Sequence, residues 1–252
     1  NLIVWAPLAV LICHRSLGLP VALAFAGGLL MVLAMALVEE RIAVRPFIQS
    51  EGTLPWILST LGVGIVLAEL GALPFGGETL AFPWHAGFDP IEFAGVRISP
   101  VQLTTIVVSL AVIGALWWFY RHTSVGRQLE AVAEDLDGAL AVGIKGARMS
   151  QIAMVLSALL AVITGWLVAP TLQVTASIGL TLTFTGFVAT AIGGVGSIGG
   201  GLAGGMIAGL VSQLTIVYLG AAWNDALLFG CLLAIYLARP TGLFGTAEGR
   251  VV

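Results

Sequence analysis

Residues 101–169 read VQLTTIVVSLAVIGALWWFY, then RHTSVGRQLEAVAEDLDGALAVGIKGARMS, then QIAMVLSALLAVITGWLVA. The two outer runs carry no Asp, Glu, Lys or Arg. Each has about the 20 residues that a helix needs to cross the ~30 Å hydrocarbon core of a bilayer. The middle run, Arg121–Ser150, holds four of the ten basic and four of the thirteen acidic residues of the chain. This pattern predicts a charged, water-exposed loop between two membrane spans.

The composition of the whole chain supports a membrane protein. The mean hydropathy is +1.06, and the sequence is 59% hydrophobic and only 9% charged, far from the values of soluble globular domains. A net charge of −3 gives no sign of a nucleic-acid partner. Cys13 and Cys231 lie in separate apolar runs and are predicted to be packing residues, and the three scattered histidines predict no metal site.

Further apolar segments predict more spans. Leu2–Cys13 is short and is interpreted as the end of a span that begins before the given sequence. Thr171–Ile192 is rich in Thr, Ser and Gly, and one tilted span, a short span and a re-entrant element all remain open. The other segments are Leu17–Val38, Thr53–Pro74, Leu202–Leu219 and Asp225–Ala238. The predicted fold is all-α, a polytopic transmembrane helical bundle of about seven to eight membrane segments in one domain, residues 1–252.

The distribution of lysine and arginine predicts the orientation. If Arg121–Ser150 is cytoplasmic, alternation of the spans leaves only Arg15 and Arg97 outside. The remaining basic residues fall inside, namely Arg41, Arg45, Arg121, Arg127, Lys145, Arg148, Arg239 and Arg250. The positive-inside rule favours this arrangement, which places the C-terminus in the cytoplasm. It requires one crossing between Pro170 and Gly193.

Small and polar residues in the membrane segments are candidates for packing or for a pathway. The run Gly193–Gly201, GGVGSIGGG, is predicted to be a turn, and it lacks the Gly-Lys-Ser/Thr ending of a phosphate loop. Glycines four apart let helix backbones approach closely in lipid. Glu69 is interpreted as either a carboxylate at the outer interface or a pathway residue, and the hydroxyls as either pathway lining or bundle hydrogen bonds. The full set is Glu69, Thr181, Thr183, Thr185, Gly193, Gly194, Gly196, Ser197, Gly200 and Gly204.

The residues suited to catalysis are not grouped into any recognisable constellation. Asn224 and Asp225 precede the last apolar segment and are predicted to be the N-cap pair of its helix.

The loop 75–99 is polar and rich in turn residues, and the predicted orientation makes it extracytoplasmic.

The charged loop carries the strongest pattern. Gln128–Ala141 is predicted to be an amphipathic helix, and Gly143 its C-terminal stop. Its apolar face would hold Leu129, Val132, Ala133, Leu136 and Leu140, and its acidic face Glu130, Glu134, Asp135 and Asp137. An acidic face is poorly suited to the anionic inner leaflet, so docking on a protein is favoured over lying on lipid.

Three stretches resemble the permease subunits of the branched-chain amino acid ABC importer family. Glu130–Ala139, EAVAEDLDGA, followed by Gly143 and Ile144, resembles the cytoplasmic coupling segment of ABC importer permeases. Glu39-Glu40-Arg41, followed by Arg45-Pro46, is similar to the first cytoplasmic loop of the family. AIGGVGSIGG at 191–200 and PTGLFG at 240–245 resemble its C-terminal half. The similarity runs from about Leu17 to Gly245, and the opening spans of the family have no counterpart here.

The resemblance implies a function and a set of partners. The chain would be one membrane subunit of an ATP-driven importer, in the cell (inner) membrane, for branched-chain or related amino acids. It would work by alternating access beside a second permease, homologous or identical, with two cytoplasmic ATPase subunits and an extracytoplasmic binding protein. ATP and magnesium would be bound in the ATPases, and this chain would hold no cofactor and catalyse no reaction. A secondary transporter or channel for small polar solutes is the alternative.

The resemblance also assigns residues to two contacts. The ATPase contact would use Glu130, Ala131, Ala133, Glu134, Asp135, Asp137, Gly138 and Gly143. Docking of the binding protein would use outward loops with His85, Asp89, Glu92, Asn224 and Asp225.

Overall fold

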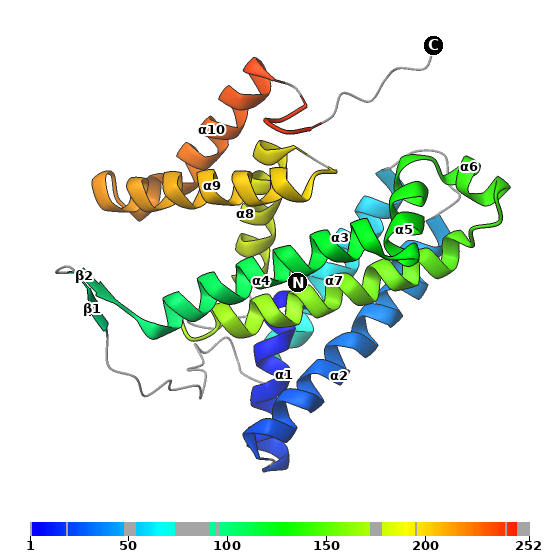
Figure 1. The fold of residues 1–252 in the computed structure, drawn as a ribbon. Helices are drawn as coiled ribbons and strands as arrows, with labels where there is room; N and C mark the ends of the chain where they lie inside the picture. The colour runs from blue at the N-terminus through cyan, green and yellow to red at the C-terminus, as the bar shows by residue number, and fades with distance from the viewer. Residues whose placement is uncertain are drawn as a thin grey trace. The chain divides into compact units, whose positions relative to one another are not determined.

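The computed structural model describes residues 2–18, 20–47, 54–73, 91–93, 96–171, 178–194, 196–239 and 241–245. Helices predominate in this part of the chain, which agrees with the predicted all-α class (Figure 1). The chain divides into two compact units, Asn1–Gly179 and Leu180–Val252, and each is described by itself.

The first unit contains most of the helices. In chain order its elements are α1 (Leu2–Leu17), α2 (Val21–Glu39), the π-helical turn η1 (Glu40–Val44), the 3₁₀ turn η2 (Arg45–Phe47), α3 (Leu54–Ala72), β1 (Ile91–Phe93), β2 (Val96–Ile98), α4 (Pro100–His122), α5 (Ser124–Glu134), α6 (Leu136–Ala141) and α7 (Gly146–Val168). The two strands form an antiparallel hairpin in which Glu92 lies opposite Arg97. The hairpin lies within the predicted loop 75–99, for which no strand was predicted.

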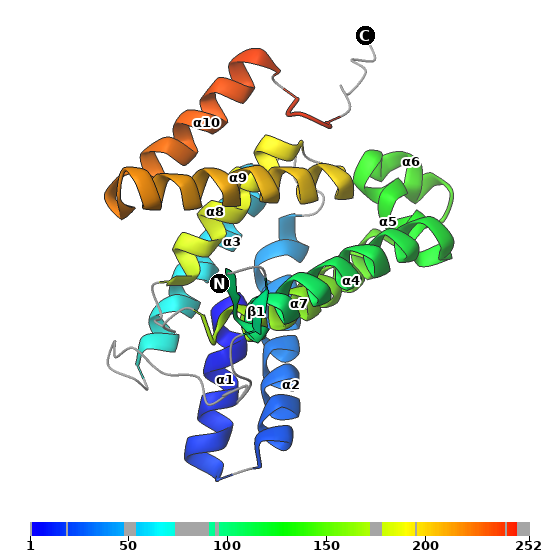
Figure 2. The same cartoon turned by 60° about the vertical axis from the view of Figure 1, so that its left-hand side comes forward.

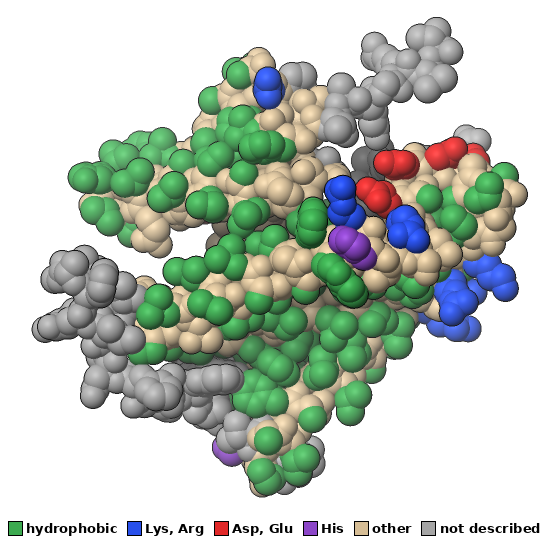
Figure 3. Space-filling model, viewed as in Figure 1, with side chains coloured by type: hydrophobic (Ala, Val, Ile, Leu, Met, Phe, Trp, Pro, Cys, Tyr) green, Lys and Arg blue, Asp and Glu red, His purple; other side chains and the backbone are tan. Residues whose placement is uncertain are grey.

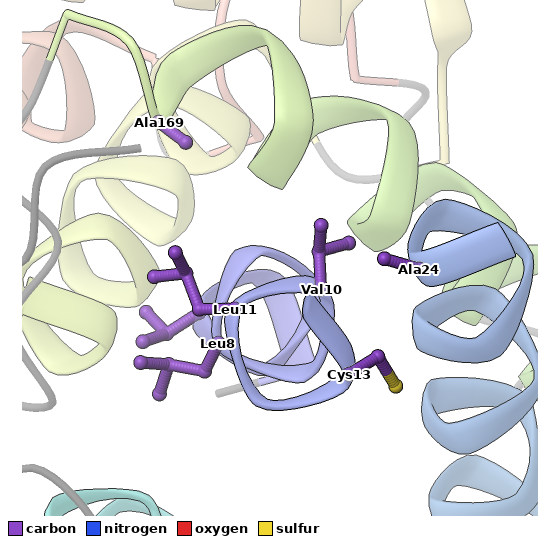
Figure 4. Packing of buried hydrophobic residues seen from close by; sticks show 7 residues of the cluster. Leu8, Val10, Leu11, Cys13, Ala24 and Ala169 are labelled. Carbon is purple, nitrogen blue, oxygen red and sulfur yellow. The ribbon is translucent and has the colours of Figure 1, made fainter. Parts of the chain in front are cut away.

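The core of the first unit forms where α1 packs against α2 and α7 (Figures 1 and 2). Leu8, Val10, Leu11 and Cys13 of α1 belong to one buried cluster with Ala24 of α2. Figure 4 shows Cys13 directed toward α2, whereas Leu8 and Leu11 leave α1 on the opposite side. Cys13 is buried, as expected for a packing residue. The indole N–H of Trp5 adds a hydrogen bond of 2.9 Å to the carbonyl of Leu67 on α3.

A glycine on α7 permits close packing against α1. Pro7 lies inside α1 and has no N–H, so the carbonyl of Ile3 receives no helical hydrogen bond from that position. A Cβ added at Gly165 would overlap this carbonyl oxygen. The two helices therefore meet backbone to backbone, an arrangement that only a residue without a side chain allows.

The second unit holds α8 from Leu180 onward (α8 spans Ile178–Gly193), α9 (Ile198–Tyr218), the 3₁₀ turn η3 (Ala221–Trp223) and α10 (Asn224–Ala238). Val188 and Ile192 of α8, Ala208 of α9 and Leu228 of α10 form its buried core. The tail folds back onto α8, because the N–H groups of Leu243 and Phe244 donate to the carbonyls of Ile192 and Gly193 at 3.0 and 2.9 Å. These bonds satisfy carbonyls that a helix end otherwise leaves free.

Five helices of the described residues are long and apolar enough to cross a membrane: Ala22–Val44, Pro100–His122, Gly146–Val168, Ile198–Tyr218 and Ala221–Ala238. Three shorter apolar helices accompany them, Leu2–His14, Leu58–Gly71 and Thr181–Gly193. The membrane-protein class is supported, whereas the predicted count of seven to eight spans is not confirmed.

Several predicted boundaries were wrong. α2 begins at Val21 and not at Leu17, because Gly18 has a positive φ of 63° and Pro20 stands at the N-cap. α7 begins at Gly146, five residues before the predicted Gln151. α9 begins at Ile198, so the glycines 199–201 are helical and the predicted turn is shorter than Gly193–Gly201.

Candidate functional site

The site with the strongest sequence pattern begins where α4 ends and α5 turns back. The hydroxyl of Thr123 donates to the carbonyl of Phe119 at 2.7 Å and accepts from the N–H of Gly126 at 2.9 Å. It therefore serves as the N-cap of α5. A Cβ at Gly126 would lie 2.6 Å from the Cα of Tyr120. The glycine lets α5 start in direct contact with the last turn of α4.

The predicted single helix Gln128–Ala141 is two helices. α5 ends at Glu134 and α6 begins at Leu136, with Asp135 between them in an extended conformation (φ −147°, ψ 102°). The carboxylate of Asp135 accepts a hydrogen bond of 3.0 Å from the N–H of Gly138. This N-cap explains the break, since an aspartate that satisfies a free helical N–H favours a new helix start over continuation.

The predicted stop at Gly143 is confirmed. Its φ of +87° lies in the left-handed region, and its N–H donates to the carbonyl of Leu140 at 3.0 Å. The N–H of Ile144 reaches the carbonyl of Ala139 at 3.0 Å. These bonds close α6, and the chain then turns into α7.

The break changes the faces that the segment presents. Glu130, Glu134, Asp135 and Asp137 are all exposed, and Figure 3 shows acidic side chains gathered over the α5 and α6 end of the first unit. Leu129 is buried, but Leu140 is 40% and Val142 is 78% exposed. A continuous helix with one apolar face was therefore the wrong description. The segment offers acidic side chains beside an apolar tip.

The α6 part of the segment contacts the bundle at α7. A Cβ at Gly146, in the first turn of α7, would lie 3.3 Å from a methyl of Leu136 and 3.7 Å from a methyl of Leu140. Gly146 is buried, as is Met149 one turn further. The two leucines of α6 thus rest on the start of a membrane-length helix.

The other coupling candidates take different places within the segment. Ala131 is half-buried and Ala133 is exposed on α5. Gly138 carries the N–H that binds Asp135, and an added Cβ there would overlap that carboxylate. All eight predicted coupling residues lie in α5, α6 and the adjoining turns, from Glu130 to Gly143, and their contact with an ATPase stays a prediction.

Three of the small-residue candidates meet in the second unit. A Cβ at Gly193 would overlap the carbonyl of Gly200, and one at Gly204 would overlap the carbonyl of Ala189. Gly194 and Gly196 have positive φ values of 101° and 90° in the turn, and Ser197 caps α9 by accepting from the N–H of Gly200 at 3.0 Å. The described geometry of this set is that of close packing between α8 and α9.

The polar pathway candidates are more dispersed. Thr181 and Thr183 are exposed, and Thr185 donates to the carbonyl of Thr181 within α8 at 2.9 Å. Glu69 is exposed in the last turn of α3, in the other unit.

The expected N-cap at Asn224 and Asp225 was wrong. Trp223 is the N-cap position of α10, without a side-chain hydrogen bond. Asn224 is already helical, and its side-chain oxygen accepts from the hydroxyl of Ser212 on α9 at 2.6 Å. Its amide lies 3.2 Å from the carboxylate of Asp225. The pair ties α10 to α9. Of the other docking candidates, Glu92 lies in β1, and His85 and Asp89 lie outside the described residues.

Sequence reasoning missed a buried carboxylate at the end of α2. Glu40 is 1% exposed, and its Oε1 accepts from the hydroxyl of Ser150 on α7 at 3.3 Å. No pattern in the local sequence separates the buried Glu40 from its exposed neighbour Arg41, because the turn that holds Glu40 is covered by α3 and α7, which come later in the chain. Nowhere in the described ranges do three His, Cys, Asp or Glu side chains come together as a metal site requires.

Comparisons with known proteins agree with the resemblance seen in the sequence. Residues 4–237 match the family model described as branched-chain amino acid transport system, permease component. The high-affinity branched-chain amino acid transport system permease protein LivH of Escherichia coli is 31% identical over 235 residues, which is 90% of this chain and 75% of LivH. BraD of Pseudomonas aeruginosa, a protein of the same description, is 29% identical over 92% of this chain and 77% of BraD.

A sugar importer is also among the similar proteins. The fructose import permease protein FrcC of Rhizobium meliloti is 29% identical over 73% of this chain and 54% of FrcC. No solved structure matches the chain.

Proposed function

Since the chain belongs to the family of permease components of branched-chain amino acid transport systems, we propose that it couples ATP hydrolysis in partner subunits to the import of an amino acid. The observation that carries the proposal is the α5–α6 segment. It is the charged, exposed end of otherwise apolar helices, and it is anchored on α7 through Leu136, Leu140 and Gly146.

The chemistry of the segment indicates the kind of surface that receives it. The apolar tip around Val142 suits a hydrophobic groove, and the exposed carboxylates Glu130, Glu134 and Asp137 suit a basic rim. Permeases of such transport systems work with ATPase and binding-protein partners. The proposed partner at α5–α6 is the cytoplasmic ATPase pair, which binds ATP and magnesium while this chain supplies no catalytic group.

The proposed cycle is alternating access. Closure of the two ATPases displaces α5–α6, and the displacement tilts α7 and the helices packed on it. A second permease, identical or homologous, completes the pathway, and the binding protein delivers substrate to the outward side. Each partner contributes only through contacts that differ between the two states, because equal contacts shift no equilibrium.

Branched-chain or related amino acids are the proposed substrates. LivH and BraD are named for them, whereas FrcC is named for fructose, so similarity at this level spans more than one solute class. We propose that the residues lining the substrate pathway lie among the hydroxyls of α8 and the glycines of α8 and α9. Glu69 is a further candidate. Five long and three shorter apolar helices leave room for the seven to eight spans expected from the sequence.

Charge reversal in α5 tests the proposal. Glu130→Lys with Glu134→Lys changes two exposed carboxylates and leaves the Asp135 cap and the apolar tip intact. We expect at least a tenfold loss of ATPase co-purification with the assembled permease, because like charges facing a basic rim cost more than about 1.4 kcal/mol. Glu130→Asp with Glu134→Asp keeps both charges and is the matched control, which should retain the ATPase.

Transport in proteoliposomes separates this proposal from a secondary transporter. With ATP held constant, uptake should persist after the membrane potential and ion gradients are dissipated. Uptake that stops under these conditions, or full ATPase binding by the reversed-charge variant, contradicts ATP-driven coupling through α5.

A further inference from the structure

The buried carboxylate of Glu40 is not explained by the fold alone. The residue is 1% exposed, Oε1 accepts one hydrogen bond of 3.3 Å from Ser150, and Oε2 has no hydrogen-bond partner among the described residues. Its neighbour Arg41 is exposed. Burying a carboxylate with one neutral donor is costly, since water is lost and little replaces it. An apolar side chain of similar size would fill this position at lower cost.

Glu40 lies where two helical geometries meet. α2 ends at Glu39, and the next residues, Glu40–Val44, form a π-helical turn. Such turns are rare and occur frequently at functional sites, because the wider turn repositions a side chain relative to the regular helix. Here it accompanies the placement of a carboxylate against α7.

Glu40 is the last link in a continuous set of contacts that begins at α6. Leu136 and Leu140 pack against Gly146 in the first turn of α7. Ser150 follows Gly146 by four residues, one helical turn further on the same face. Its hydroxyl then donates to Glu40 at the end of α2.

Beyond this hydrogen bond, α2 and α7 share a buried core. Val32 and Ala36 of α2 pack in one cluster with Ala158 and Val162 of α7. Close-packed contacts of this kind transmit displacement as rigid shifts, whereas a hydrogen bond can be exchanged. The Glu40–Ser150 bond is therefore the exchangeable link between α7 and the end of α2.

We propose that Glu40 is a positioning residue of the transport cycle, which holds the end of α2 to α7 through Ser150 in one state and exchanges donors through Oε2 in the other. The proposal rests on the proposed function, because it takes α5–α6 as the place where the ATPases act. Oε1 of Glu40 has a hydrogen-bond partner and Oε2 has none among the described residues. A donor that reaches Oε2 in only one state would favour that state, and such a difference is what couples ATP hydrolysis to transport.

Two small substitutions test the link. Glu40→Gln keeps the size and the accepting Oε1 but removes the charge, and Ser150→Ala removes only the donor. In the complete transporter reconstituted with its binding protein, we expect both variants to retain ATPase subunits and melting temperature. The amount of substrate imported per ATP hydrolysed should fall at least fivefold. A fivefold change corresponds to the lower end of ordinary coupling free energies. The double variant should be no worse than the more affected single variant, because both changes act on the same Glu40–Ser150 link: Glu40→Gln removes the carboxylate charge, and Ser150→Ala removes the donor.

Two controls belong to the same helix. Ser150→Thr keeps a hydroxyl donor and should restore the ratio of import to hydrolysis, and Ser157→Ala removes an exposed hydroxyl of α7 and should not change it. A wild-type ratio in both Glu40→Gln and Ser150→Ala overturns the proposal. So does a loss of melting temperature in Glu40→Gln combined with a normal ratio in Ser150→Ala, since the carboxylate is then only structural. If the wild-type permease retains no ATPase, the proposed function itself fails, and that result is separate from the behaviour of the variants.

Discussion

At the scale of single residues, Asp135 has a role that differs from its predicted one. It was expected on the acidic face of a continuous helix, beside Glu134. The structure shows its carboxylate bound to the N–H of Gly138, so that it starts α6. A charged residue in a docking segment can thus be needed for the shape of the segment and not for contact with the partner.

Substitution of Asp135 tests the capping role. Asp135→Ala should destabilise α6 by about 1 kcal/mol, the usual value of an N-cap. Hydrogen exchange at the amides of residues 138–142 should then become about fivefold faster. Asp135→Asn keeps a capping oxygen and should exchange like the wild type. Equal exchange rates in the alanine and asparagine variants would show that the carboxylate does not hold the α6 start.

The same comparison shows which residues a sequence can identify. Gly143 was predicted correctly, because a glycine after a helical pattern is a local signal for a left-handed stop. Asp135 carried a local signal too, but its place in an acidic pattern outweighed its N-cap propensity. Glu40 carried none. It is buried by helices that come later in the chain, and its hydrogen-bond partner Ser150 is 110 positions away.

At the scale of elements, the glycines of α9 divide into two kinds. A Cβ at Gly204 would overlap the carbonyl of Ala189 on α8, whereas a Cβ at the adjacent Gly205 would meet nothing within 4 Å. Both glycines have another glycine four positions earlier, Gly200 and Gly201, so this spacing alone does not separate them. Only the helix that lies alongside decides which glycine is needed.

Alanine substitutions at these adjacent positions test the packing of α8 against α9. Gly204→Ala should destabilise the protein by about 1–3 kcal/mol, as overpacked positions do. Gly205→Ala should be neutral or slightly stabilising, because alanine favours the helix more than glycine does. The measurement is the melting temperature of the detergent-solubilised protein, with unfolding monitored by the fluorescence of an attached label. Equal melting temperatures for the two variants would contradict the close approach at Gly204.

The helices themselves were easier to predict than their ends. Long apolar runs set the existence of α4, α7, α9 and α10, because hydrocarbon requires every backbone group to be paired inside a helix. Ends were wrong where a helix continues into polar sequence, as at Gly146. A polar stretch can remain helical outside the apolar core, so hydropathy marks the membrane and not the end of the helix.

At the scale of the whole molecule, the orientation depends on α8. In the first unit, the contact between Glu40 and Ser150 places the basic residues around Arg41 near those at the start of α7. This grouping is what the predicted cytoplasmic side requires. The second unit follows the prediction only if the chain crosses once between Pro170 and Gly193.

The length of α8 makes this crossing worth testing. The helix Ile178–Gly193 has 16 residues. At ~1.5 Å a residue it covers roughly 24 Å, less than the ~30 Å of an average hydrocarbon core. A short span can be accommodated by local thinning of the bilayer or by neighbouring helices. We therefore expect α8 to cross, with its last turn covered by the tail residues that bind Ile192 and Gly193.

Labelling from each side of the membrane decides the matter. In a background with Cys13→Ala and Cys231→Ala, Val142→Cys should react with a membrane-impermeant maleimide only from the cytoplasmic face, since Val142 is 78% exposed on the charged segment. Ala222→Cys, in the exposed turn before α10, should react only from the opposite face. If α8 did not cross, alternation through α9 would bring Ala222 to the cytoplasmic side, and both cysteines would react from that face. In unsealed membranes the maleimide has access to both faces, so both cysteines must react there. This control shows that each position is accessible to the label. Labelling from opposite faces requires an odd number of crossings between Val142 and Ala222. Three helices, α7, α8 and α9, give an odd number, whereas α7 and α9 alone give an even one.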